Sequence, residues 1–192
     1  MQELKERIRK EGKVLPGNII KVDGFLNHRI DTELMDHIAE EFGKHFNMDE
    51  VTMILTAEAS GIALSAIVAQ HVHKPMIFAK KAKSDNIEGG LYQSDIFSYT
   101  YKKKVTLLVS KEWMSADDKV LIIDDFMANG EAMRGLCDIV EAAGATLVGI
   151  GCAVEKGFQG GGDRLRAAGV NLHSLAIIES AEPGNIVFRD EN

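Results

Sequence analysis

Cysteine is scarce in this chain of 192 residues: it has only Cys137 and Cys152, and neither belongs to a Cys-x-x-Cys pair. Each lies in an apolar segment, so we expect two buried, reduced thiols. No apolar run approaches the roughly 18 residues that a membrane-spanning helix needs. The charged N-terminal stretch MQELKERIRKEGK also lacks the apolar region of a signal peptide. We therefore expect a cytoplasmic protein without a membrane partner.

Basic residues and metal-binding motifs are also in short supply. The chain has 29 acidic and 22 basic residues and a formal net charge of −7, whereas nucleic-acid binding depends on a basic face. We therefore expect no nucleic-acid partner. The six histidines form no H-x-x-x-H or H-E-x-x-H pattern, and we expect no metal held by the protein itself. No G-x-G-x-x-G follows an early strand, which argues against a dinucleotide-binding fold.

The spacing of apolar residues predicts alternating helices and strands. Helical periodicity covers residues 2–11, 32–46, 62–69 and 131–143. Short apolar runs predict strands at 51–56, 75–79, 105–109, 120–123, 147–154 and 175–178. This alternation is typical of an α/β fold with a parallel sheet flanked by helices, in one domain spanning 1–192. Residues 14–30 show no clean period and are expected to form an irregular covering segment, and Gly160–Gly162 a flexible turn.

The most informative stretch follows the apolar run Val120–Ile123. Two adjacent acids, Asp124 and Asp125, come next, and then a small-residue turn, Ala128–Gly130, that opens a helix. The first amides of a helix lack internal partners and the helix dipole is positive there, so such a turn suits a phosphate. The acids suit a sugar diol or the magnesium of a Mg–phosphate complex. The motif favours a phosphorylated sugar ligand; a capping turn with solvated acids is the alternative.

This motif resembles the signature by which type I phosphoribosyltransferases bind phosphoribosyl pyrophosphate (PRPP). The resemblance implies that Asp124 and Asp125 are catalytic and face the ribose hydroxyls, and that Mg²⁺ arrives with PRPP. It also implies a 5′-phosphate loop made of Ala128, Asn129, Gly130, Glu131 and Ala132. Hypoxanthine–guanine transferases usually carry an Asp at the position of Ala128, where it is thought to handle the purine N7 proton, whereas adenine transferases share the small residue. The resemblance therefore assigns no general base here.

Other segments fit the same family. The loop after the first predicted strand, with Ser60, corresponds to a pyrophosphate-binding loop, although a simple connection would look alike. A lysine after the second strand reaches pyrophosphate in the family; Lys81 is favoured over Lys80, and both could be solvated surface lysines. The long polar connection 81–104 contains Ser98–Tyr99, a pair often found in a mobile loop that closes over PRPP. A flexible hairpin or a dimer contact is the alternative.

Over its full length the chain resembles the small bacterial xanthine phosphoribosyltransferases, most clearly in the stretches VDGFLNHRID and VEKGF. The resemblance implies a purine pocket in which Lys156 donates to O6, Asn27 addresses O2 and Ile20 contributes a backbone contact. Asn27 as a turn residue and Lys156 as a surface lysine are the alternatives. Phe158 could stack on the purine or serve in packing.

The same resemblance implies a type I phosphoribosyltransferase fold with a small hood formed by residues 14–30 and 154–192, and a homodimer. The expected reaction is purine salvage, in which the 5-phosphoribosyl group passes from PRPP to N9 of xanthine to give xanthosine 5′-monophosphate and pyrophosphate. Two alternatives stay open: a transferase that prefers guanine or hypoxanthine, and a PRPP- or nucleotide-sensing regulator of purine metabolism on the same fold.

Overall fold

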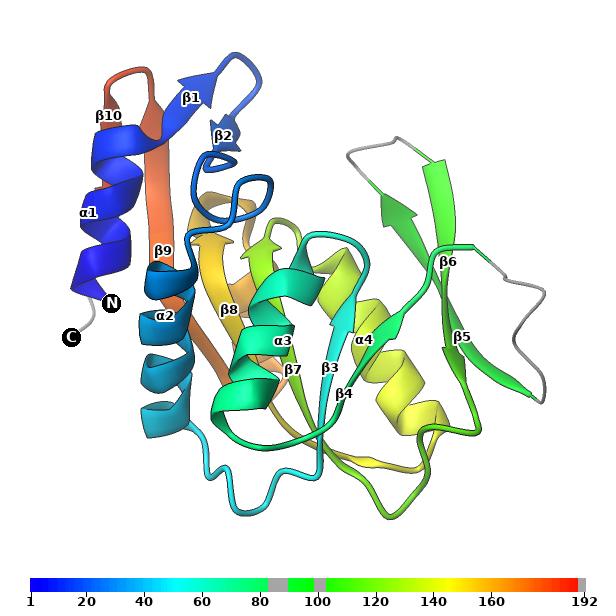
Figure 1. Cartoon of the computed structure of the whole chain (residues 1–192). Coiled ribbons are helices and arrows are strands. Elements are labelled where there is room, and N and C mark those ends of the chain that lie inside the picture. Colours follow the sequence, from blue (N-terminus) through cyan, green and yellow to red (C-terminus); the bar gives the residue numbers. More distant parts are fainter. Residues whose placement is uncertain (83–89, 99–102, 190–192) are drawn as a thin grey trace.

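The computed structural model describes residues 1–82, 90–98 and 103–189. A mostly parallel sheet forms its centre (Figure 1). Its strands, in order across the sheet, are β10 (Asn185–Phe188), β9 (Leu172–Glu182), β8 (Thr146–Lys156), β7 (Lys119–Met127), β3 (Met53–Ala57) and β4 (Met76–Ala79). Only β10 runs antiparallel, to β9. The carboxyl ends of the five parallel strands therefore share one edge.

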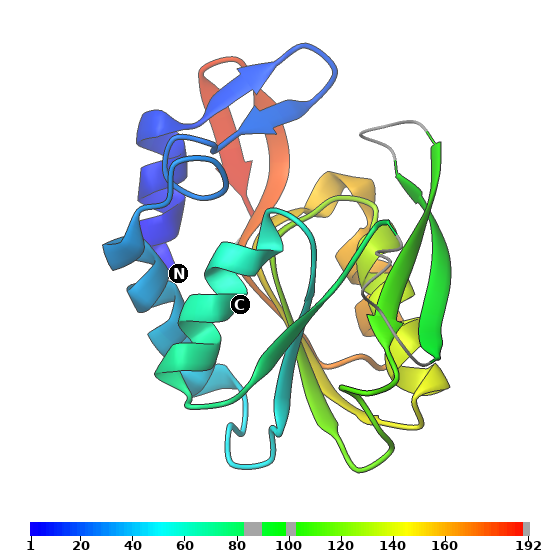
Figure 2. The same ribbon diagram turned by 45° about the vertical axis from the view of Figure 1, so that its right-hand side comes forward.

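Helices cover both faces of this sheet (Figure 2). On one face lie α1 (Gln2–Glu11), α2 (Thr32–His45) and α3 (Gly61–His71); on the other lie α4 (Glu131–Ala142) and α5 (Gly161–Ala167). Alternate residues of β7 point to opposite faces, because strand side chains have a period of two. Leu121 and Ile123 belong to the core beneath α2 and α3, and Val120 and Ile122 to the core beneath α4. The predicted α/β fold with two covered faces is confirmed.

Most predicted elements are present, with shifts of a few residues at their ends. Asp31 caps the start of α2, since its carboxylate accepts a hydrogen bond from the Leu34 amide at 3.2 Å. Cys137 and Cys152 are both free thiols, the first partly buried and the second buried. No helix in the described part of the chain is long and apolar enough to cross a membrane.

The segment expected to be irregular contains a small hairpin instead. Strands β1 (Lys13–Leu15) and β2 (Ile19–Lys21) pair antiparallel. The three-residue turn between them places Gly17 and Asn18 at φ values of 84° and 59°. Glycine and asparagine tolerate this left-handed region best, so the turn residues favour the hairpin. Figure 1 shows the hairpin beside the upper end of β9 and β10, above the carboxyl edge of the sheet.

The strand predicted at 105–109 does not join the central sheet. It is part of β6 (Lys103–Ser110), which pairs antiparallel with β5 (Leu91–Ser98) and forms an isolated bridge from Leu108 to Lys80, the residue after β4. Gly135 of α4 lets this hairpin approach, since a Cβ there would lie 2.5 Å from Ile96. An apolar run satisfies a buried hairpin as well as a parallel strand, so the pattern did not distinguish them. Tyr99 lies outside the described residues.

The flexible turn predicted at Gly160–Gly162 is also wrong. Gly161 and Gly162 are buried and begin α5, after Gly160 at a φ of 69°. A Cβ on Gly162 would overlap the Glu155 carboxylate. Close packing therefore requires glycine at these helix positions, where its low helix propensity suggested a turn.

Candidate active site

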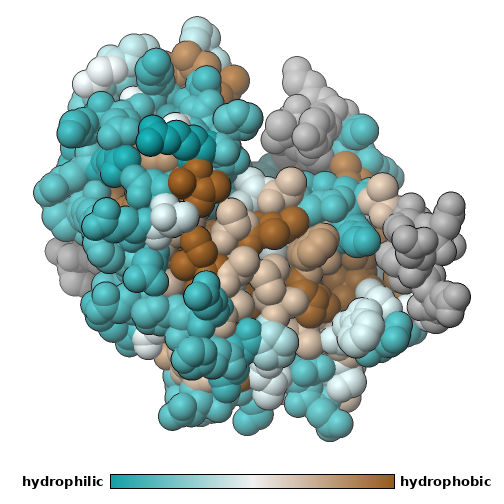
Figure 3. Space-filling model, in the orientation of Figure 1, coloured by the Kyte–Doolittle hydropathy of each residue, from teal (hydrophilic) through white to brown (hydrophobic). Residues whose placement is uncertain are grey.

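A cavity of about 470 Å³ lies at the carboxyl edge of the parallel strands. Figure 3 shows a notch at the upper edge of the molecule, beside the lobe that carries β1 and β2 and above the end of β7. All residues predicted for the site line this cavity: Ile20, Asn27, Ser60, Lys81, Asp124, Asp125, Ala128, Asn129, Gly130, Glu131, Ala132 and Lys156. The fold thus brings together segments that are far apart in the sequence.

The turn between β7 and α4 lines one end of the cavity. Gly130 precedes the first residue of α4 and has a φ of 82°, which a side chain would disfavour. The amide of Glu131 is the first of the helix, and the Asn129 side-chain oxygen accepts from it at 3.4 Å. Unpaired amides at a helix start carry partial positive charge and point outward along the axis. This geometry suits a phosphate group.

The two acids sit at the floor of the cavity and are nearly buried, with 6% of Asp124 and 1% of Asp125 exposed. Asp125 accepts hydrogen bonds from Asn27 Nδ2 at 2.9 Å and from Ser60 Oγ at 2.8 Å. Its own amide donates to Asp124 Oδ1 at 3.0 Å. Burial, and then the neighbouring Asp125, raise the pKa of Asp124 well above its usual value.

The loop after β3 forms the wall next to the acids. Its Glu58–Ala59 peptide bond is cis, and the Glu58 carboxylate accepts a hydrogen bond from the Lys81 amide. A Cβ on Gly61 would overlap the Asp124 carboxylate, so the start of α3 must be glycine to approach the acids. Lys81 lines the cavity, as favoured from the sequence, whereas the Lys80 backbone is bonded to Leu108 of β6.

Ile20, Asn27 and Lys156 line the same cavity from three separate segments: β2, the loop before α2 and the end of β8. Lys156 Nζ donates to the Asn18 carbonyl at 2.9 Å and lies 5.3 Å from the Phe126 ring centroid. Burial lowers the pKa of Lys156 below its usual value. The side chain therefore ties β8 to the β1–β2 turn.

The structure decides between the two roles left open for Phe158, and it brings two other aromatic residues to the cavity. Phe158, considered for stacking, packs against the apolar core of α1–α3. Phe126 and Phe97 line the cavity instead. The motif holds Phe126 between the acids and the phosphate turn, but strand periodicity alone did not mark it as a site residue. Phe97 belongs to the β5–β6 hairpin, and no local sequence pattern predicted the position of this hairpin.

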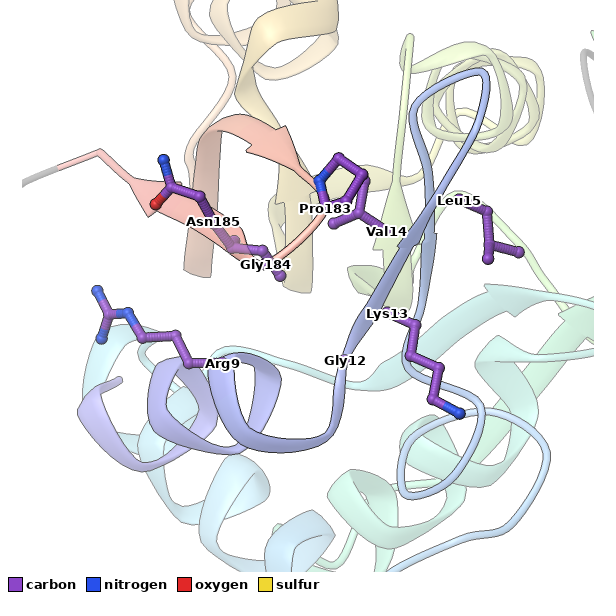
Figure 4. Close-up of a pocket in the computed structure, with 9 residues that line it drawn as sticks. Arg9, Gly12, Lys13, Val14, Leu15, Pro183, Gly184 and Asn185 are labelled. Carbon is purple, nitrogen blue, oxygen red and sulfur yellow. The ribbon is translucent and has the colours of Figure 1, made fainter.

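A second cavity, of about 510 Å³, lies between the end of α1, β1 and the β9–β10 turn (Figure 4). Its labelled side chains do not converge: Arg9 and Asn185 extend to one side in Figure 4, and Lys13 and Leu15 to the other. Binding sites need polar groups that point at a common ligand. Size alone therefore does not make this cavity the functional site.

The candidate metal ligands are few. Within residues 1–82, 90–98 and 103–189, no three His, Cys, Asp or Glu side chains gather into a metal-binding group. Glu58 and Glu131 also line the cavity, and Asp124 and Asp125 are the two acids that are adjacent in the sequence. Carboxylate oxygens are suitable ligands for magnesium, and one or two of them suffice when substrate phosphates supply the rest. The pair therefore fits a magnesium ion that enters with a phosphorylated substrate.

Comparison with known proteins defines the class. Residues 25–166 match the phosphoribosyl transferase domain, and the chain belongs to the phosphoribosyltransferase family. Among solved structures, adenine phosphoribosyltransferase from Giardia lamblia complexed with 9-deazaadenine superposes with a TM-score of 0.76 at 21% identity, covering 90% of this chain and 96% of that one. This likeness shows the fold alone, and the predicted type I fold is confirmed.

Curated relatives are more similar in sequence. The xanthine phosphoribosyltransferase of Bifidobacterium animalis subsp. lactis (strain AD011) is 53% identical, over 98% of this chain and all of the relative. That of Lachnoclostridium phytofermentans (strain ATCC 700394 / DSM 18823 / ISDg) is 52% identical over the whole of both chains. The resemblance to bacterial xanthine phosphoribosyltransferases predicted from the sequence is confirmed.

Proposed function

We propose that this enzyme transfers the 5-phosphoribosyl group of PRPP to N9 of xanthine, giving xanthosine 5′-monophosphate and pyrophosphate in purine salvage. The observation that carries the proposal is that a single cavity joins the phosphate turn, the acid pair and Lys156. The similarity to xanthine phosphoribosyltransferases over the full chain supports the same activity.

In this proposal, PRPP lies along the carboxyl edge of β7 and β3. The amides of residues 128–132 bind its 5′-phosphate, and Asp124 and Asp125 face its ribose hydroxyls. Ser60 and Lys81 address the pyrophosphate from the loop after β3 and the end of β4. Magnesium bound to PRPP would neutralise charge on the pyrophosphate.

The purine would lie under the β1–β2 hairpin. Lys156 donates to O6, and the Ile20 backbone contacts the ring. Asn27 Nδ2 carries two N–H groups, and one is used by Asp125. The second is then available for O2, the oxygen that distinguishes xanthine from hypoxanthine.

The reaction breaks the bond between C1′ and a pyrophosphate oxygen and forms the bond between C1′ and N9. Positive charge develops on the ribose in the transition state, and the buried carboxylates stabilise it, while Lys81 stabilises the departing pyrophosphate. The purine must also lose its ring-nitrogen proton. The methyl group of Ala128 cannot accept that proton, so in this proposal it passes to water or to the departing pyrophosphate.

The proposal is tested by incubating the purified protein with PRPP and Mg²⁺ and with xanthine, guanine or hypoxanthine, and measuring nucleotide and pyrophosphate. We expect xanthosine 5′-monophosphate to form with the highest kcat/KM. A higher value with guanine or hypoxanthine would change the assigned base. If PRPP bound but no base were converted, a PRPP-sensing regulator would be the better reading.

Several expectations about the surroundings of the enzyme stay predictions. They are a homodimer, a cytoplasmic location and the absence of nucleic-acid partners. The mass of the native protein in solution tests the first of these.

A further inference from the structure

Helix α5 lies directly against the turn that we assign to the 5′-phosphate. A Cβ on Gly161 would sit 2.6 Å from the Ala128 carbonyl oxygen, 2.6 Å from the Asn129 carbonyl carbon and 2.7 Å from the Gly130 nitrogen. Glycine thus lets the helix touch the peptide between Asn129 and Gly130. The contact lies outside the signature motif, more than thirty residues along the chain.

Arg164 of the same helix donates two hydrogen bonds that bracket this contact. Its Nη2 donates to the Asn129 carbonyl at 2.8 Å, and its Nη1 donates to the Gln159 carbonyl at 3.5 Å. The guanidinium therefore links the phosphate turn to the turn that precedes α5. Charged donors form stronger hydrogen bonds than neutral ones.

The helix that carries Arg164 is itself well anchored. Arg166 makes two hydrogen bonds, of 3.0 and 2.7 Å, to the fully buried Glu155 carboxylate of β8. Asp163, one turn before Arg166, accepts a hydrogen bond from Arg189 at 2.6 Å. A bond from Arg164 consequently ties the phosphate turn to the central sheet.

Peptide geometry gives this bond a function. In a trans peptide the C=O and N–H groups point in opposite directions, and the Asn129–Gly130 bond is trans. Because Arg164 holds the Asn129 carbonyl, the Gly130 N–H must point away from the guanidinium. Gly130 lines the cavity.

We propose that Arg164 is a positioning residue that holds the Asn129–Gly130 peptide so that the Gly130 amide is presented to the 5′-phosphate of the substrate. The inference rests on the proposed function, in which this turn binds that phosphate. Arg164 does not touch substrate in this account; it acts through the backbone of Asn129.

The test measures binding of two fragments of PRPP to the full-length chain by calorimetric titration: ribose 5-phosphate, which carries the 5′-phosphate, and inorganic pyrophosphate with Mg²⁺. For Arg164→Gln we expect the Kd for ribose 5-phosphate to rise about three- to tenfold, the size of one net hydrogen bond. The Kd for pyrophosphate stays unchanged. The KM for PRPP rises while the KM for xanthine does not, and Arg164→Lys restores part of the loss.

Arg9→Gln is the matched control, because it removes another exposed arginine, which lies over Phe188 and away from the site cavity. We expect it to leave both affinities unchanged. Equal weakening of both fragments by Arg164→Gln would point to a general loss of positive charge or of structure and would overturn the inference. Unchanged binding of ribose 5-phosphate would overturn it as well.

A third variant separates this inference from the proposed function. Gly130→Ala places a side chain at a positive φ within the phosphate turn itself, 3.3 Å from Gly161. If it weakens ribose 5-phosphate and Arg164→Gln does not, only the role of Arg164 is wrong. If Gly130→Ala folds and binds ribose 5-phosphate like the original protein, the proposed phosphate site is wrong.

Discussion

The two parts of the active-site cavity are built in different ways. The phosphate side, as we assign it, comes from one continuous stretch, residues 124–132, and offers mainly backbone amides and two adjacent acids. The purine side, as we assign it, comes from Ile20, Asn27 and Lys156, which lie on three separate segments. In the proposal Asn27 and Lys156 act through their side chains and Ile20 through its backbone. A backbone site is specified by local chain geometry, whereas a side-chain site is specified by how distant segments pack.

The two sides meet at one hydrogen bond, from Asn27 to Asp125. In the proposed function, this bond holds the segment over the purine to the floor of the sugar site. Ser60 bonds to the other oxygen of the same carboxylate. Asp125 therefore contacts both sides of the cavity, and we expect its substitution to disturb both.

The largest effect is expected from Asp125→Ala. The change removes a carboxylate assigned to the ribose and leaves Asn27 and Ser60 without their acceptor. We expect kcat/KM for PRPP to fall about 100-fold or more, measured by steady-state kinetics. Asp118→Ala is the control, because Asp118 lies just before the opposite end of β7 and bonds to Thr52. Near-full activity of Asp125→Ala would contradict the ribose role.

A smaller and more selective effect is expected from Lys156→Ala. The variant loses the donor assigned to O6 and the bond to the Asn18 carbonyl. We expect the KM for xanthine to rise about ten- to a hundredfold, as for a charged hydrogen bond, with a smaller change for PRPP. Lys119→Ala, an exposed lysine at the start of β7, serves as control. A larger rise in the KM for PRPP than in the KM for xanthine would assign Lys156 to the phosphate side of the cavity and contradict its role at the purine.

The smallest effect is expected from Gly161→Ala, which tests the packing behind the phosphate side. The new methyl group forces α5 and the phosphate turn apart, and we expect a loss of about 1–3 kcal/mol in the free energy of unfolding. Because the displaced turn is the one assigned to the 5′-phosphate, the KM for PRPP should rise about several-fold more than the KM for xanthine. Denaturant unfolding and kinetics measure the two quantities.

Gly43→Ala is a matched control that should change the free energy of unfolding in the opposite direction. Gly43 lies in α2, and a Cβ there meets nothing within 4 Å. Alanine in a helix interior should therefore raise the free energy of unfolding by about 0.5–1 kcal/mol. If both alanine variants behaved alike, the close approach at Gly161 would not matter to the fold.

Sequence reasoning succeeded where the signal was local. The run from Val120 to Ala132 predicted a strand, an acid pair and a helix start, and all three are present, although β7 continues to Met127 and so contains the acids. Strand and helix periods are local properties, so the α/β class followed as well. The purine residues were reached only through resemblance to a family, since no local pattern distinguishes Asn27 or Lys156 from surface residues.

The failures have a shared cause in tertiary packing. The β1–β2 hairpin has strands of only three residues, too short for a period to show. The apolar run Val105–Val109 correctly predicted a strand, but it did not predict that this strand pairs with β5 rather than with the central sheet. Gly161 and Gly162 predicted a turn, and the helix there exists because close packing against Ala128–Gly130 and Glu155 offsets their low propensity.

The sequence by itself determined the alternation of strands and helices, the phosphate turn and the acids beside it, because each depends on residues within a few positions of one another. Only the tertiary structure decided that Ile20, Asn27 and Lys156 share a cavity with that turn, and that Arg164 reaches the Asn129 carbonyl from behind it. Contacts between distant segments depend on the packing of the whole core, and no local pattern encodes which segments will meet.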